Sequence, residues 1–362
     1  MNKLNYIRKL GTKAKKAAQD LSVLSEKKKN SVLKSFYLKI KKNSKKILDS
    51  NKIDINNSKK NKLKDNLIDR SLLNKDRIKS ILDSIDEVIS FKDPTHKVIA
   101  KWRRPNNLII NRVTMPIGVL GVIYEARPNV TSDVAILSFK SGNSAILRGG
   151  KEALQSNIVI SNLFRSSLKI NNVNQDCIQL VNNTDRKIVD LMLSKMSNYL
   201  DIIIPRGGKG LVKKVLELSN VPTIGHLEGL CHVYLDYQYD YKTAEKIIFN
   251  SKLRRTSICG AAETLLIHKS VKVNDIYKIL KKLNGSGCII IGDKKIKKIF
   301  KKSILAKESD WSKEYLESKI SVKIVDNINE AIKHIKKYGT NHTECIISKN
   351  KKNIKTFERN ID

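Results

Sequence analysis

A cysteine in a short turn of small residues is the side chain of this sequence best suited to covalent chemistry. Cys259 follows Arg254 and Arg255 and precedes Gly260 and two alanines. Nearby cations and backbone N–H groups favour the thiolate, which is the attacking form of a cysteine. Small residues after it would let a substrate carbonyl approach the sulfur while its developing oxyanion reaches backbone donors. We therefore predict a nucleophile at Cys259; the alternative is a small buried hydrophobic residue after Ile258.

Two glycine-rich turns, each expected between a strand and a helix, are candidate anion sites. They comprise residues 148–152 and 205–210, and both carry arginine and lysine. Backbone N–H groups converge at the start of a helix, and arginine binds phosphate or carboxylate through two parallel hydrogen bonds. Neither turn is a G-x-G-x-x-G motif, so each alone is a weak signal for a dinucleotide. Two such turns in one sheet strengthen that interpretation.

Other reactive residue types are less specific signals. Glu228 could act as a general base and His232 as an acid, but isolated acids and histidines in glycine-rich loops more often have structural roles. The cysteines number five and have no C-x-x-C spacing, which argues against a disulfide framework and a zinc site. We expect no metal.

The basic composition suggests a polyanionic partner, but the residue types argue against one. The formal net charge of +36 would favour nucleic acid or an anionic surface. However, 57 of the 71 basic residues are lysines spread along the chain, aromatic residues make up 6%, and no nucleic-acid-binding motif is present. We interpret the lysines as a solvated surface and expect neither a nucleic-acid nor a membrane partner. No apolar run reaches the roughly 18 residues of a membrane helix and no signal peptide is recognisable, so we expect a cytoplasmic protein.

The reactive residues must be positioned by the elements that the hydrophobic pattern predicts. At 362 residues the chain suits about two domains. Residues 1–90 follow a helical period, with a lysine- and asparagine-rich interruption at 49–62 that we interpret as a solvated linker or helix surface. Turn signals at 93–94 and 104–107 flank two short β-type runs and predict a hairpin.

From residue 117 onward, short apolar strands alternate with helices. This is the pattern of a parallel sheet with crossover helices, so the fold class is α/β. We expect strands at residues 117–124, 144–147, 177–181, 200–204, 264–267, 288–291, 322–324 and 342–348. We expect helices at 133–140, 185–196, 243–250, 276–283, 295–304 and 328–337, with further helices opening near 152 and 211.

Several runs of sequence together carry a family resemblance. They are residues 115–131, 140–153, 204–211, 231–236 and 254–264, and the most specific part is Tyr-Glu-Ala-Arg-Pro-Asn-Val-Thr at 124–131. In this order they resemble the γ-glutamyl phosphate reductase (glutamate-5-semialdehyde dehydrogenase) family, which belongs to the aldehyde dehydrogenase superfamily. The resemblance covers nearly the whole chain.

The resemblance implies an aldehyde dehydrogenase-like architecture in three parts. A Rossmann-like cofactor domain with the N-terminal helices would cover residues 1–230, and an α/β catalytic domain would cover 231–362. A hairpin at 96–116 would belong to a small β oligomerisation element. The family also implies a homo-oligomer and functional coupling with glutamate 5-kinase.

The resemblance also implies a reaction and the residues that perform it. The reaction would be NADPH-dependent reduction of L-glutamyl 5-phosphate to L-glutamate 5-semialdehyde with release of phosphate, the second step of L-proline synthesis from glutamate. Cys259 would form a thioester, and Asn129 would complete the oxyanion site with the Cys259 N–H. The cofactor NADPH or NADP would be held by residues of both glycine-rich turns: Arg148, Gly149, Lys151, Pro205, Arg206, Gly207 and Gly208.

The substrate's anionic groups call for cations. Arg127, Arg254 and Arg255 are our candidates for binding its phosphate or α-carboxylate, because guanidinium groups suit both. An acyl phosphate carries a good leaving group and the last step is a reduction, so no water-activating base is needed. Glu228 is therefore a doubtful catalytic residue.

The C-terminal end departs from the family pattern. Family members continue for several dozen residues beyond the segment that matches 338–346, whereas this chain ends sixteen residues after it. We expect a C-terminally truncated chain that lacks late catalytic-domain structure and one strand of the oligomerisation element. Three alternatives stay open: oxidation of a free aldehyde with Glu228 as base, a lysine-rich nucleic-acid-binding protein, and an inactive fragment.

Overall fold

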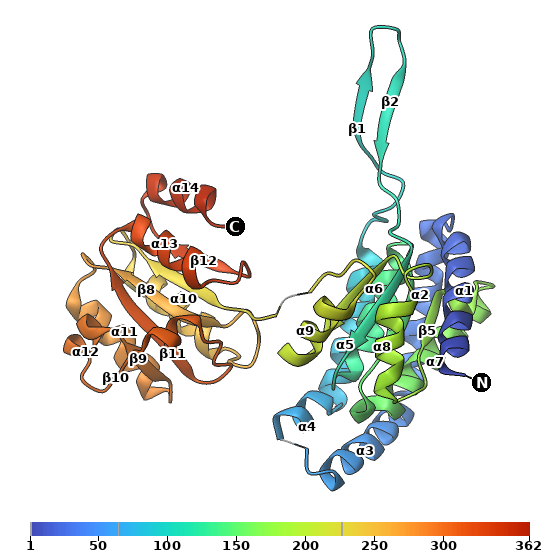
Figure 1. Ribbon diagram of the computed structural model, residues 1–362, viewed down its shortest axis with the longest axis horizontal. Helices are drawn as coiled ribbons and strands as arrows, with labels where there is room; N and C mark the ends of the chain where they lie inside the picture. The colour runs from blue at the N-terminus through green and yellow to red at the C-terminus, as the bar shows by residue number, and fades with distance from the viewer. Residues whose placement is uncertain (1, 64, 226) are drawn as a thin grey trace. The chain divides into compact units, whose positions relative to one another are not determined.

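The computed structural model describes residues 2–63, 65–225 and 227–362. The chain forms two compact units, Met1–Gly225 and His226–Asp362, which we call the first and second units. Each has a parallel sheet with helices on both faces, so the predicted α/β class is confirmed (Figure 1). Within the described residues, no helix combines the length and the apolar character that crossing a membrane requires.

The first unit is built on a four-stranded parallel sheet with the order β5-β4-β3-β6. The strands are β3 (Val119–Tyr124), β4 (Ser144–Arg148), β5 (Ile178–Leu180) and β6 (Ile202–Arg206). Every residue of β3 and β4 is buried, which explains their continuous apolar sequence. The chain runs from β3 to β4 and β5 and then returns to the other side of β3 as β6. The carboxyl ends of β3 and β6 thus form a switch point, where open α/β sheets bind ligands.

Helices cover both faces of this sheet. They are α1 (Lys3–Ser22), α2 (Glu26–Lys42), α3 (Ser44–Lys60), α4 (Asp65–Ser71), α5 (Lys75–Ser90), α6 (Pro128–Lys140), α7 (Leu154–Ile170), α8 (Arg186–Lys195) and α9 (Lys209–Leu218), with 3₁₀ turns η1 (Lys151–Ala153) and η2 (Gln175–Cys177). Side chains alternate along β3: Leu120, Val122 and Tyr124 share a core with α2, α5, α6 and α7, whereas Val119 and Ile123 share one with α1 and α8. The sheet is therefore buried between two helical layers.

A hairpin stands out from the first unit (Figure 1). It consists of β1 (Val98–Arg103) and β2 (Ile109–Val113), which pair antiparallel, and this confirms the predicted hairpin. Trp102 lies opposite Ile110, and the two residues are 48% and 42% exposed. Contiguous exposed apolar side chains of this kind mark an interaction surface.

The second unit has a six-stranded parallel sheet with the order β10-β9-β11-β8-β7-β12. The strands are β7 (Cys231–Leu235), β8 (Ala262–His268), β9 (Ile289–Gly292), β10 (Ile304–Leu305), β11 (Lys319–Val325) and β12 (Glu344–Ile347). The helices are α10 (Tyr241–Leu253), α11 (Val273–Gly285), α12 (Lys294–Ile299), α13 (Ile328–Tyr338) and α14 (Lys351–Asn360), with the 3₁₀ turn η3 (Glu308–Ser312). One core joins the sheet to α10, α11 and α12, and another joins it to α13.

Several elements differ from the sequence prediction. Residues 49–62 mostly belong to α3, and one face of that helix is buried through Asn51 and Asp54. The helix expected at 295–304 ends at Ile299, and Ile304 belongs to a strand. Strand β7 and helix α14 were not predicted. Asp54 accepts hydrogen bonds from Ser156, and the exposed Ile304 pairs with Ile291, so contacts outside the local pattern decide these elements.

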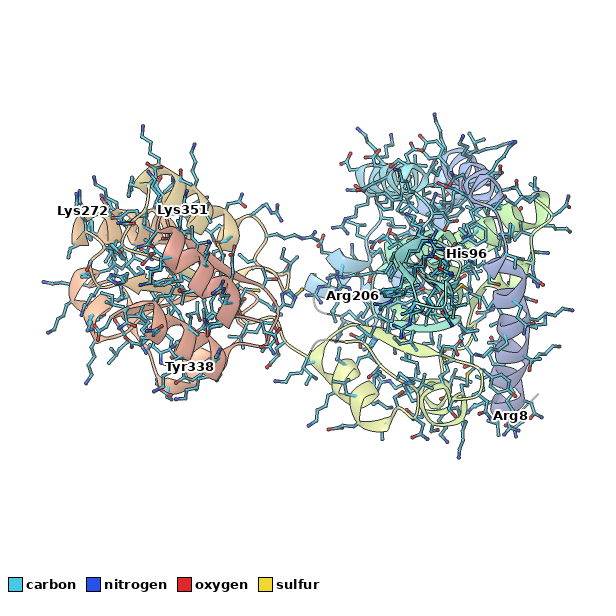
Figure 2. The ribbon with its side chains drawn as sticks, turned by 90° about the horizontal axis from the view of Figure 1, so that it is seen from above. Arg8, His96, Arg206, Lys272, Tyr338 and Lys351 are labelled. Carbon is cyan, nitrogen blue, oxygen red and sulfur yellow. The ribbon has the colours of Figure 1, made fainter. Side chains whose placement is uncertain are left out.

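The surplus of basic residues is largely a surface feature. Lys272 and Lys351, at the starts of α11 and α14, are exposed (Figure 2). Lys29, Lys140 and Lys252 are exceptions, because each is at most 3% exposed. A buried lysine needs an anionic partner, so these three positions carry structural information that composition hides.

Candidate active site

Cys259 lies in the turn that links α10 to β8 in the second unit. The Ala261 N–H donates to the Ile258 carbonyl at 3.0 Å and closes the turn. The side chain of Cys259 is half-buried. A Cβ built on Gly260 would meet no atom within 4 Å, so the space beside this residue is open. The turn thus combines a defined backbone with room for a substrate.

The other four cysteines are poor nucleophiles. Burial raises the pKa of the Cys177 and Cys231 thiols to about 12 and that of Cys288 to about 11. Burial also raises the pKa of Cys345. A thiol that keeps its proton at neutral pH reacts slowly, because the thiolate is the nucleophile. Cys259 is the cysteine that remains as the candidate.

Gly229, in the loop before β7, packs directly against Cys259. A Cβ on Gly229 would lie 2.3 Å from the Cys259 carbonyl oxygen and 2.7 Å from the Cys259 Cβ. Only glycine permits such a close approach of two backbones. The Gly229 N–H also donates to Glu314 Oε1 at 3.1 Å. One side of the cysteine turn is therefore set by a residue that the sequence did not single out.

Cys231 contacts the Cys259 backbone, and His342 in turn lies against Cys231. The Cys231 thiol donates to the Cys259 carbonyl at 3.1 Å, and its sulfur lies 3.5 Å from His342 Nδ1. His342 comes from the segment that precedes β12. In the sequence, both residues lie in segments that resemble the family, but their spacing from Cys259 did not indicate a contact.

Arg254 and Arg255 lie on the same turn as Cys259. Both are exposed, and the Arg254 N–H caps α10 by donating to the Asn250 carbonyl at 3.2 Å. Two exposed arginines on the turn that carries Cys259 suit the predicted role of substrate cations. Arg127, the third candidate, belongs to the first unit, where it is the half-buried N-cap residue of α6.

Asn129 also lies in the first unit, in the first turn of α6. Its amide Nδ2 donates to Asp133 Oδ2 at 3.0 Å. Burial raises the pKa of Asp133 despite this hydrogen bond. The amide carries a second N–H, so this contact leaves it one donor for another acceptor.

The end of β4 provides a buried cation and an exposed one. Arg148 is 8% exposed; its Nη1 donates to the Gly149 carbonyl at 2.8 Å and its Nη2 to the Thr184 carbonyl at 3.0 Å. Its Nε has no hydrogen-bond partner among the described residues. Lys151 is exposed in η1. A buried guanidinium with an unused donor fits an anionic group at this strand end, which is where the sequence placed a cofactor phosphate.

Gly149 shows how tightly this strand end is built. A Cβ there would lie 2.2 Å from Asn157 Nδ2 and 3.1 Å from the Tyr124 ring. The Tyr124 hydroxyl and Thr131 Oγ1 lie 2.6 Å apart, and Thr131 donates to Asn157 Oδ1 at 2.9 Å. Asn157 Nδ2 itself is buried without a partner among the described residues.

The second glycine-rich turn is partly occupied by a side chain of the protein itself. Glu125 Oε2 accepts from the Gly208 N–H at 2.8 Å, and the Glu125 N–H donates to the Arg206 carbonyl at 3.1 Å. A Cβ on Gly207 would lie 2.6 Å from the same carboxylate oxygen. Glu125, which sequence reasoning missed as a contact of this turn, thus neutralises the start of α9.

The turn also begins later than predicted. Pro205 is buried and Arg206 is exposed, and both are the last residues of β6 rather than part of the turn. Pairing with β3 extends the strand over them, since Ile123 lies opposite Pro205 and Tyr124 opposite Arg206.

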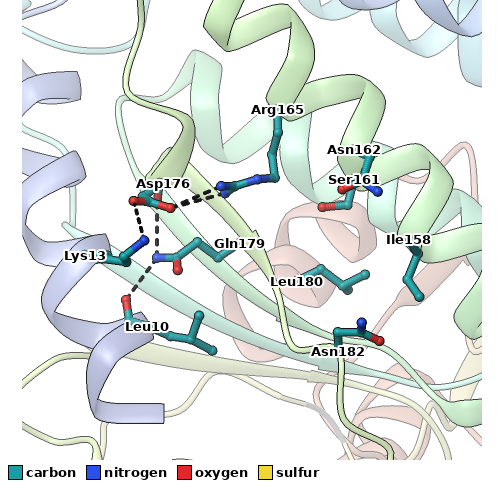
Figure 3. Close-up of a pocket in the computed structure, with 10 residues that line it drawn as sticks. All are labelled: Leu10, Lys13, Ile158, Ser161, Asn162, Arg165, Asp176, Gln179, Leu180 and Asn182. Carbon is teal, nitrogen blue, oxygen red and sulfur yellow. Dashed lines mark hydrogen bonds and ion pairs between the residues drawn. The ribbon is translucent and has the colours of Figure 1, made fainter. Parts of the chain in front are cut away.

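Two cavities of the first unit lie away from all of these residues. One, of about 270 Å³, contains Lys13 and Arg165, but Asp176 lies 3.4 Å and 3.3 Å from these cations (Figure 3). Gln179 donates to the Leu10 carbonyl there at 2.9 Å. The other, of about 750 Å³, lies among residues of α3 and α5. The paired charges of the first cavity indicate a structural network, and neither cavity is lined by a predicted site residue.

The predicted residues fall into two groups, one in each unit. The second unit brings together Cys259, Arg254 and Arg255 on one turn. The first unit brings the remaining residues to the carboxyl ends of β3, β4 and β6. Among residues 2–63, 65–225 and 227–362, no group of three or more His, Cys, Asp or Glu side chains is arranged to hold a metal ion.

Comparisons with known proteins agree with one another. No family model matches the chain. The γ-glutamyl phosphate reductase of Mesorhizobium japonicum is 43% identical over 353 residues, which are 98% of this chain and 82% of that protein. The protein of the same name from Dictyoglomus thermophilum is 40% identical and covers 99% of this chain, which spans 86% of it.

Solved structures of the same family and of an aldehyde dehydrogenase also match this chain. The crystal structure of γ-glutamyl phosphate reductase from Thermotoga maritima matches with a TM-score of 0.94 and 38% identity, over 100% of this chain and 86% of that one. An acetylating aldehyde dehydrogenase from Geobacillus thermoglucosidasius matches with a TM-score of 0.68 and 17% identity, over 98% of this chain and 84% of that one. The expected aldehyde dehydrogenase-like fold is therefore confirmed.

Proposed function

This chain belongs to the γ-glutamyl phosphate reductase family of oxidoreductases, and on that premise we propose that it reduces L-glutamyl 5-phosphate to L-glutamate 5-semialdehyde with NADPH. Phosphate is the second product. The reaction would be the second step of L-proline synthesis from glutamate.

Cys259 is the nucleophile in this proposal. Its thiolate attacks the acyl carbon, and the bond from that carbon to the phosphate oxygen breaks. Phosphate departs, and the acyl group stays bound to Cys259 as a thioester. NADPH, when bound, would supply the hydride that brings the thioester carbon to the aldehyde level. The Cys259 sulfur then leaves as thiolate, and the semialdehyde is released. The observation that carries this assignment is that Cys259 is half-buried in a turn with open space beside Gly260, whereas burial raises the pKa of the other four cysteines.

The oxyanion that forms during each addition needs hydrogen-bond donors. We assign the Cys259 backbone N–H and the Asn129 amide to this role, and one Asn129 N–H is already engaged by Asp133. Arg254, Arg255 and Arg127 are assigned to the substrate's phosphate and α-carboxylate. Arginine suits both because its planar fork matches either group.

The cofactor's ribose and phosphate side is assigned to the end of β4, and the turn after β6 is assigned to face the cofactor. The buried Arg148 with its unpartnered Nε, together with the exposed Lys151, supports binding of an anion at β4. The Gly207–Gly208 turn lies at the switch point between β3 and β6, where a dinucleotide is expected in such a sheet. A cation pair at this position favours a 2′-phosphate, and hence NADPH over NADH.

Assembly and location complete the proposal. We assign homo-oligomer formation to the β1–β2 hairpin, because its exposed apolar residues support an interface. We also propose that the enzyme is cytoplasmic and works in functional coupling with glutamate 5-kinase.

The test is phosphate-dependent reduction of NADP with glutamate 5-semialdehyde, which is the reaction in reverse. The unaltered chain should be active only with phosphate, and Cys259→Ala should abolish the activity. Cys345→Ala is the matched control, because Cys345 is also half-buried in the second unit but lies on β12. Activity that does not need phosphate and yields the free acid would instead indicate hydrolytic oxidation of an aldehyde, and activity that survives Cys259→Ala would overturn the proposed nucleophile.

A further inference from the structure

A fully buried ion pair joins the two ends of the turn that carries Cys259, residues 254–261. Lys252 is the last lysine of α10 and Glu263 is the second residue of β8, so the two residues flank the turn on either side. Lys252 Nζ lies 2.7 Å from Glu263 Oε2, and the side chains are 0% and 1% exposed. Burying two charges is costly, and such pairs are frequently no more stabilising than apolar residues of the same size. Stability alone is therefore a weak reason for a buried pair beside a reactive cysteine.

The same carboxylate also holds a strained turn from another part of the chain. Glu263 Oε1 accepts from the Leu316 N–H at 3.2 Å. Leu316 has a φ of 53°, in the left-handed region that a branched residue rarely adopts. Such a conformation persists only where the surroundings hold it, and the Glu263 carboxylate is one of the groups that does so.

This strained turn leads back to Cys259. Glu314, two residues before Leu316, accepts from the Gly229 N–H at 3.1 Å. Gly229 in turn packs against the carbonyl oxygen and Cβ of Cys259. A continuous path of contacts therefore runs from Glu263 through residues 314–316 and Gly229 to the nucleophile, while Lys252 and Glu263 also tie together the two ends of the turn.

We propose that Lys252 and Glu263 are a positioning pair: they hold the Cys259 turn from both ends and, through Leu316 and Glu314, hold Gly229 against it. The inference rests on the proposed role of Cys259 as nucleophile. Burial raises the pKa of the Glu263 carboxyl and the adjacent Lys252 ammonium opposes this rise, which favours the ionised form that is the stronger acceptor for the Leu316 N–H. The pair acts through the backbone and does not touch the substrate.

Two double variants separate positioning from stability. Lys252→Gln with Glu263→Gln replaces the ion pair by hydrogen-bonding amides and keeps an oxygen that can accept from Leu316. Lys252→Met with Glu263→Leu fills the same space with apolar groups and removes that acceptor. Both exchange the ion pair for uncharged residues, an exchange that buried pairs often tolerate. The measurements are kcat, the KM for NADP, and hydrogen exchange of residues 254–261 and 314–316.

We expect the amide variant to keep kcat within about threefold, whereas the apolar variant should lose about 100-fold, the effect of displacing a reacting group by about 1 Å. The KM for NADP should stay within about twofold in both, because the proposed cofactor residues lie in the first unit. Exchange at 254–261 and 314–316 should accelerate together, by roughly tenfold or more, in the apolar variant only. Equal kcat and equal exchange in the two variants would overturn the proposal.

The exchange measurement does not depend on enzymatic activity. If the unaltered chain shows no reductase activity, the proposed function fails, while exchange still decides whether the pair holds the two segments. If neither double variant folds, hydrogen exchange in the unaltered chain decides whether the pair holds the two segments. The pair predicts that residues 254–261 and 314–316 open at a common rate, and independent opening of the two segments contradicts it.

Discussion

Replacing Gly229 by alanine tests the geometry around Cys259, the proposed nucleophile, most directly. The new Cβ would lie 2.3 Å from the Cys259 carbonyl oxygen and 2.7 Å from the Cys259 Cβ. Non-bonded heavy atoms settle at roughly 3.5 Å, so one of the two backbones must move by about 1 Å. Such a displacement of a reacting group lowers kcat by about 100-fold. Overpacking of this kind also lowers the free energy of unfolding by about 1–3 kcal/mol.

The assay is phosphate-dependent NADP reduction, with kcat and KM measured for Gly229→Ala and for a matched glycine variant. Gly285→Ala serves as the control, because Gly285 ends α11 in the same unit and a Cβ there meets no atom within 4 Å. We expect Gly285→Ala to keep its kcat within about twofold and its stability within about 1 kcal/mol of the unaltered chain, as for a compatible glycine-to-alanine exchange. A Gly229→Ala variant with unreduced kcat would refute the reasoning, since the close approach would then not set the position of Cys259.

Three further predictions concern other parts of the chain. Lys151→Met should raise the KM for NADP about tenfold, the loss of one charge-assisted contact to phosphate, with an unchanged melting temperature because Lys151 is exposed; an unchanged KM would remove Lys151 from the cofactor site. Burial raises the pKa of Asp54, so its contribution to stability is most favourable below about pH 4 and is lost as the pH rises through the raised pKa. The Asp54→Asn side chain cannot ionise. The melting temperature of this variant should therefore rise relative to that of the unaltered chain as the pH increases from 4 to 7. A difference in melting temperature that does not change with pH would contradict this. Trp102→Lys should shift the chain towards monomer in light scattering without altering its circular dichroism, because Trp102 is exposed opposite Ile110 on the hairpin; an unchanged mass would exclude that surface from assembly.

Local sequence patterns were sufficient for most of the elements. The hairpin follows from its Arg-Pro-Asn-Asn turn between two short apolar runs, and β3 and β4 follow from apolar runs that end at turn residues. Patterns failed where long-range contacts decide the outcome. Helix α12 stops at Ile299 because Ile304 pairs with Ile291 as a strand. Strand β7 escaped prediction because its short run, with histidine and tyrosine in it, is buried between neighbours that are distant in sequence.

Within the candidate site, too, local features were predictable from the sequence and long-range contacts were not. The cysteine turn was recognisable because its cations and small residues are consecutive in sequence. The contacts of Gly229, Cys231 and His342 around Cys259 join segments that are 28 to 111 residues apart, and no spacing rule connects such positions. Glu125 illustrates the same limit, since its carboxylate meets Gly208 across a separation of 83 residues.

The α/β class, the family, the hairpin and Cys259 as the candidate nucleophile were predictable from the sequence, because each of these is encoded in consecutive residues or in short periodic patterns. The tertiary structure alone decided that Lys252 and Glu263 are a buried pair, that Glu263 also holds Leu316, and that Gly229 fixes the backbone of Cys259. The physical reason is that burial and hydrogen bonding depend on which segments meet in space. A lysine near the end of a helix and a glutamate near the start of a strand have the same local pattern whether they face water or each other.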